Sequence, residues 1–88
     1  MPTLFKYRGI SAYMYYEDIE KHNLPHFHIT YGEHQASFDL EGNLLVGKLP
    51  VKKYREIKSI ATDYQTEFKK AWENAVIGVP FDKIPIRK

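Results

Sequence analysis

The 88-residue sequence contains no cysteine, so it cannot form a disulfide framework or a thiolate metal site. It also has no run of eighteen apolar residues, no low-complexity segment and no internal repeat. A Gly-rich phosphate loop, a nucleophilic serine motif and a paired-carboxylate signature are missing as well. Since the first residues lack the apolar core of a signal peptide, we expect a cytoplasmic protein that does not enter a membrane.

The composition is that of a folded chain, because 43% of the residues are hydrophobic and 27% are charged. A chain of this length is expected to form a single domain over residues 1–88. Its charge is uneven: residues 1–47 carry three basic and six acidic side chains, whereas residues 48–88 carry ten basic and five acidic ones. The basic half permits a nucleic acid or an acidic partner to bind, although a solvated helix face gives the same count.

Short apolar and aromatic runs separated by turns indicate that strands occupy about residues 3–47. We expect strands at 3–7, 10–17, 26–31, 34–40 and 44–47, with an acidic loop before Pro25. Gly32 and Glu33 are expected to form a type II′ turn between the third and fourth strands.

The predicted hairpin has one register that keeps similar side chains together. In this register Phe27, Ile29, Ala36 and Phe38 share one face, and the histidines lie on the other. The predicted pairs are Tyr31 with His34, Thr30 with Gln35, Ile29 with Ala36, His28 with Ser37, Phe27 with Phe38 and His26 with Asp39.

From Leu49 onward the apolar residues recur every three or four positions, which predicts one long helix over about residues 50–77 and a short C-terminal tail. Pro50 suits the first turn, and Gly78 and Pro80 end the helix. The predicted fold is therefore α+β: an antiparallel meander of four or five strands with one long C-terminal helix packed on one face.

All four histidines fall between residues 22 and 34. His26 and His28 are expected to project from the same face, away from the helix, because alternate strand residues share a side. Asp39 is expected opposite His26, where its carboxylate could fix the imidazole tautomer and raise its basicity. His22 could fold back toward the same place.

Two chemistries fit this arrangement. His26 and His28, with His22 or Asp39, could hold a divalent metal through nitrogen and oxygen donors. Alternatively His26, oriented by Asp39, could act as general base, with His28 or Tyr31 as the acid, on a phosphodiester such as RNA without any cofactor. A third interpretation is that the histidines are exposed polar residues on a solvated sheet face and do no chemistry.

The complete pattern resembles a family of small bacterial proteins known as a domain of unknown function. The resemblance rests on "HNLPHFH" at 22–28, in which Pro25, His26 and His28 form the Pro-His-x-His element, and on "YGEHQASFDL" at 31–40. Pro2 and Thr3, the aromatic residues Tyr15 and Tyr16, "LP" at 49–50 and Trp72 also match. Lys21 and Leu24 stand where the family usually has an acid and a second proline.

The resemblance implies a two-gene arrangement similar to a type II toxin-antitoxin module, with this chain as the toxin. The implied partner is a small antitoxin-like protein encoded by a neighbouring gene, which would neutralise the toxin by direct contact. The alternative from another class is a non-catalytic interaction or regulatory domain, such as an antitoxin or a nucleic-acid-binding accessory, whose sheet edge and basic helix bind a partner.

Overall fold

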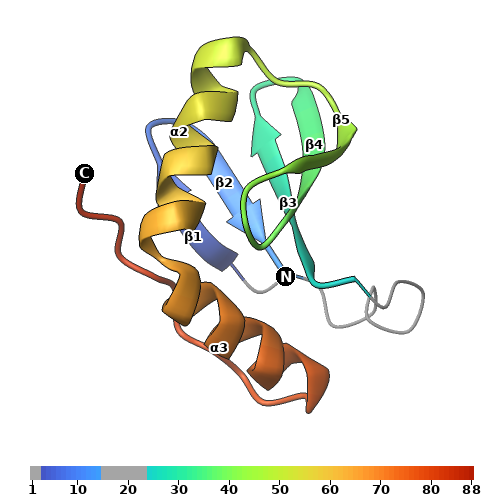
Figure 1. The fold of residues 1–88 in the computed structure, drawn as a ribbon, viewed down its shortest axis with the longest axis vertical. Helices are drawn as coiled ribbons and strands as arrows, with labels where there is room; N and C mark the ends of the chain where they lie inside the picture. Colours follow the sequence, from blue (N-terminus) through green and yellow to red (C-terminus); the bar gives the residue numbers. More distant parts are fainter. Residues whose placement is uncertain (1–2, 15–23) are drawn as a thin grey trace.

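The computed structural model describes residues 3–14 and 24–88, in which five strands form one antiparallel sheet and two helices follow. The strands are β1 (Thr3–Tyr7), β2 (Ile10–Tyr13), β3 (His26–Tyr31), β4 (His34–Asp39) and β5 (Leu44–Gly47), and the helices are α2 (Val51–Asp63) and α3 (Gln65–Val76). Strands that are consecutive in the chain are neighbours in the sheet. Figure 1 shows α2 crossing in front of the sheet and α3 at its lower end. The α+β class and the meander are confirmed.

The β3–β4 hairpin has the predicted register at all six positions, from Tyr31 opposite His34 to His26 opposite Asp39. Gly32 has a φ of 57°, as the first central residue of a type II′ turn requires. A shift by one residue would set Phe27 opposite Asp39 and turn the apolar residues of one of the two strands toward solvent, so burial of this face holds the register.

Four phenylalanines connect the sheet to the helices. Phe68 of α3 stacks on Phe5 at 5.8 Å and meets Phe27 edge-on at 5.3 Å between ring centroids. Phe27 in turn stacks on Phe38 at 5.9 Å. All four are completely buried, and aromatic pairs at such distances add to the stabilisation that comes from burial. The apolar face predicted for the hairpin is thus the face that the helices cover.

The prediction of one long helix is wrong, because the helical segment is broken at Tyr64 into α2 and α3. Tyr64 has φ −116° and ψ 30°, outside the helical range. A straight helix over residues 51–76 would be roughly 39 Å long, about twice the ~20 Å of a six-residue strand. Only a broken helix brings both Ile57 and Phe68 onto so small a sheet.

Gln65 explains where the break occurs. Its side-chain amide donates hydrogen bonds to the carbonyl oxygens of Leu40 and Ala61, the second at 2.8 Å. In a continuous helix the Ala61 carbonyl would accept the main-chain N–H of Gln65 instead. A side chain that inserts into this ladder kinks the helix, and neither Gly nor Pro is required. In the described part of the chain, neither helix is long and apolar enough to cross a membrane.

The two edges of the sheet differ. Along β1, the main-chain N–H of Ile84 in the C-terminal tail donates to the Leu4 carbonyl at 2.8 Å, and Ile84 is buried. Every residue of β5 is exposed, with Val46 at 69%. The second predicted strand is shorter than expected, because β2 ends at Tyr13; its predicted residues 15–17 lie outside the described residues.

A substitution at Gly47 tests how closely β5 packs against β4. It has a φ of 93°, and a Cβ there would lie 2.2 Å from the Gln35 carbonyl oxygen and 2.7 Å from the Ala36 Cα. We expect Gly47→Ala to lower the free energy of unfolding by about 2–5 kcal/mol, from left-handed strain together with the backbone clash. Urea titration measures this change.

Gly32→Ala is the matched control, because Gly32 also has positive φ but a Cβ there would meet nothing within 4 Å. Only the strain remains, so the expected loss is about 1–2 kcal/mol. Equal losses in the two variants would contradict the close approach of β5 to β4.

Candidate functional site on the open sheet face

The side of the sheet that faces away from the helices carries polar residues at alternate strand positions. One row across the strands is formed by Tyr13, His28, Ser37 and Val46. A second row is formed by Lys6, Ser11, Thr30 and Gln35. We call the surface made by these eight residues the open face.

A groove of about 490 Å³ lies on the open face. It is lined by Tyr13, His28, Ile29, Thr30, Gln35, Ala36, Ser37, Val46 and Gly47. We call it the sheet groove. His28 lies on the central strand of the sheet and is half-buried. Because its imidazole lines the groove, a small molecule or a flat ring that enters the groove can reach it.

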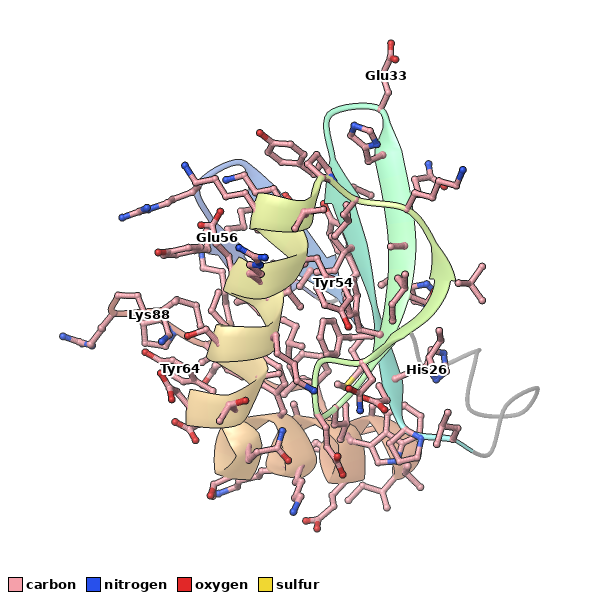
Figure 2. All side chains as sticks on the ribbon, turned by 45° about the horizontal axis from the view of Figure 1, so that its top comes forward. His26, Glu33, Tyr54, Glu56, Tyr64 and Lys88 are labelled. Carbon is pink, nitrogen blue, oxygen red and sulfur yellow. The ribbon has the colours of Figure 1, made fainter. Side chains whose placement is uncertain are left out.

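His26 is the first residue of β3, two positions before His28, and it is buried, with 6% of its surface exposed. Its ring contacts Trp72 of α3, with 5.6 Å between ring centroids. The expectation that His26 projects away from the helical segment is therefore wrong, because α3 turns across the end of the sheet and covers this residue. The Nδ1 atom lies 2.8 Å from the Leu24 carbonyl oxygen, which can only accept, so Nδ1 carries the proton and donates. In the neutral ring the lone pair is therefore on Nε2. Figure 2 shows His26 at the end of β3 near α3, with Glu33 at the opposite tip of the hairpin.

The structure brings His26 and His28 together on one face. Their rings meet edge to face with 5.2 Å between centroids. The Nδ1 atom of His28 lies 3.1 Å from the Ser37 Oγ, within hydrogen-bond distance, and the His28 tautomer decides which atom donates. Two differently placed imidazoles result, because His26 is buried and oriented by the main chain whereas His28 opens into the sheet groove.

Asp39 pairs with His26 in the register, as predicted, but its carboxylate serves the β4–β5 turn. Its Oδ1 accepts the main-chain N–H groups of Glu41 and Asn43, both at 2.9 Å, and its Oδ2 accepts the Asn43 side-chain amide at 3.1 Å. The sequence predicted that Asp39 would orient His26. The group that does so at Nδ1 is the Leu24 carbonyl, because the turn that follows β4 needs the carboxylate to satisfy its own N–H groups.

Tyr31 lies away from the histidine pair. It is at the other end of β3 and on the helix side, where its ring stacks on His34 at 6.2 Å and the Lys53 Nζ lies 5.0 Å from the ring centroid. The structure therefore does not bring Tyr31 to the sheet groove. His22, the other residue expected to assist, lies outside the described residues.

Within residues 3–14 and 24–88, no three side chains of His, Asp or Glu gather in a way that could hold a metal ion. His26 and His28 supply two imidazoles, while the carboxylate of Asp39 bonds to the turn. A three-ligand site that used His22 would include a residue outside the described part of the chain.

Trp72 and Leu24 also belong to the site, and neither was predicted there. Trp72 follows the apolar helix period, which indicates only a position against the core; the break at Tyr64 directs α3 toward His26. Leu24 contributes a main-chain carbonyl, for which side-chain patterns carry no signal. Leu24 and Trp72 also line a separate pocket of about 300 Å³ beside β4.

The fold and the site define a small α+β domain with a histidine pair on a five-stranded antiparallel sheet. Residues 9–73 match the model of a family described as a domain of unknown function, DUF4160, and the chain belongs to this family. The matched segment includes both histidines and Trp72. No curated protein and no solved structure matches the chain.

Variants of Asp39 distinguish two roles of its carboxylate, which are bonding to the β4–β5 turn and orienting the His26 ring. Asp39→Asn can keep both bonds to Oδ1, so we expect a loss of about 0.5 kcal/mol in the free energy of unfolding. Asp39→Ala loses all three bonds, and we expect about 2 kcal/mol. Urea unfolding measures both variants, and ¹⁵N chemical shifts of His26 report its tautomer. The proton should stay on Nδ1 in both, whereas a change of tautomer in Asp39→Asn would assign the orienting role to the carboxylate.

Proposed function

We propose that the chain is the toxin-like component of a bacterial type II toxin-antitoxin module, and that His28 in the sheet groove is its reactive side chain. The observation that carries the proposal is the pairing of the half-buried imidazole of His28 with the buried imidazole of His26, with 5.2 Å between the ring centroids. The Pro-His-x-His element at Pro25–His28, the basis of the family resemblance, is the segment that builds this pair.

The arrangement suits general acid-base chemistry. Imidazole is the side chain that most readily gains and loses a proton near neutral pH. Ser37 holds the His28 ring from one side and the His26 ring packs against it from another, so the reacting group is oriented before substrate binds. Positioned acid-base groups contribute typically 10²–10⁴-fold to a rate.

A partner would neutralise such a toxin by covering the groove. The proposed partner is a small antitoxin-like protein encoded by a neighbouring gene. The sheet groove is bounded on one side by Val46 and Gly47 of the exposed strand β5, so a protein seated on β5 would also reach the groove.

Growth of a bacterial culture after induction tests the proposal. We expect the parent chain to arrest growth and His28→Ala to restore colony counts at least about 100-fold, in line with loss of an acid-base group. His34→Ala is the control, since His34 is an exposed histidine on the same hairpin that contacts Tyr31 instead of the groove. Circular dichroism establishes that all three proteins fold. No arrest by the parent, or equal arrest by parent and His28→Ala, would refute the proposal.

The second candidate is a non-catalytic interaction domain, and the open edge of the sheet favours it. Leu44, Leu45 and Val46 are 40%, 42% and 69% exposed, whereas the tail covers the β1 edge through Ile84. An exposed apolar edge strand is a template on which a partner can add a strand.

Leu45→Lys tests this second function, because a lysine on an edge strand opposes the addition of another strand. We expect the Kd for the neighbouring gene product, measured by calorimetry, to rise at least about tenfold. Val79→Lys is the control: Val79 is a similarly exposed apolar residue in the tail, 45% exposed. Equal affinities for Leu45→Lys and the parent would rule out docking at β5.

A further inference from the structure

We infer that the open face binds single-stranded RNA, with bases stacked against Tyr13 and His28 and the backbone crossing the strands between Lys6 and Lys48. The inference rests on the proposed function, because it names the substrate class of the sheet groove. Three features carry it: the rings on that face, a lysine at each end of one row across the strands, and a groove lining without carboxylates among the described residues.

The rings of the groove come from neighbouring strands. Tyr13 of β2 lies directly opposite His28 of β3 in the register, and both line the groove. Paired residues on adjacent strands have Cβ atoms about 4.5–5.5 Å apart, so the two side chains lie next to each other in the groove. Unstacked RNA bases are bound by stacking on Tyr, His and similar rings.

A transverse row beside these two side chains has a lysine at each end. Lys6 pairs with Ser11, Ser11 with Thr30, and Thr30 with Gln35. The main-chain N–H of Lys48 donates to the Gln35 carbonyl at 3.3 Å, which places Lys48 at the β5 end of the same row. With about 4.8 Å between strands, the two lysines are separated by roughly 19 Å of sheet. Both are exposed, so each can contact a phosphate.

The surface between the lysines favours RNA over an apolar protein segment. None of the described residues that line the groove carries a carboxylate. A carboxylate there would repel the phosphates of the RNA. The side chains of the groove include the Thr30 and Ser37 hydroxyls and the Gln35 amide. Such groups can bond to base edges and to the ribose 2′-hydroxyl, the group by which a protein distinguishes RNA from DNA.

Fluorescence anisotropy of the full chain with a labelled single-stranded 12-nucleotide RNA of mixed sequence tests the inference. We expect Tyr13→Leu, which keeps apolar bulk, to weaken binding roughly tenfold or more through lost stacking. We expect the double variant Lys6→Gln, Lys48→Gln to weaken binding and to lower the slope of log Kd against log salt by about 2, one for each phosphate contact.

The control is the double variant Lys52→Gln, Arg55→Gln, which removes the same charge from exposed residues of α2. These two side chains line a pocket with Tyr7 and Glu56 on the helix side. If RNA uses the open face, this control retains the affinity and salt slope of the parent. Loss of binding in the control with none in the Lys6 and Lys48 variant would move RNA to the helix side and overturn the inference.

Three further outcomes separate this inference from the proposed function. No RNA binding by a chain that still arrests growth overturns the inference and leaves the toxin assignment standing. RNA binding without growth arrest supports the inference and refutes the toxin assignment. Equal binding of single-stranded DNA of the same sequence overturns the assignment to RNA, because the 2′-hydroxyl would then contribute nothing.

Discussion

The pairing of β3 with β4 across the Gly32 turn is the constraint on which the rest of the structure depends. Because strand residues alternate, one register simultaneously buries Phe27 and Phe38 under the helices and places His28 and Ser37 on the opposite side. A shift by one residue would set Phe27 opposite Asp39 and mix apolar and polar side chains on both faces. The packing that stabilises the fold is therefore the same packing that creates the histidine face.

The break between α2 and α3 determines which helix residues reach the histidine pair. Gln65 binds the Leu40 carbonyl that follows β4, and it occupies the Ala61 carbonyl that a continuous helix would have used. As a result α3 turns across the end of the sheet, with Phe68 in the core and Trp72 against His26. The buried histidine is thus held by a helix far away in the sequence, while its neighbour His28 stays open to the groove.

Membership of the DUF4160 family identifies the chain without assigning it an activity. On the open face an imidazole, a hydroxyl and a tyrosine lie together in a groove whose described lining has no carboxylate, between Lys6 and Lys48. Acid-base chemistry and a nucleic-acid substrate suit this surface together. The exposed apolar edge at β5 adjoins the same groove, so a partner bound there would lie beside the reactive group.

Local pattern in the sequence was sufficient for the strands of the hairpin, its register and the shared face of His26 and His28, because alternation and turn chemistry act between residues close in the chain. The approximate bounds of the helical segment followed from the apolar period in the same way. Tertiary structure decided the break at Tyr64, the contact of Trp72 with His26 and the bonding of Asp39 to its turn rather than to the imidazole. These features depend on helix length relative to sheet size and on competition for hydrogen-bond partners, and both are settled only when distant segments pack together.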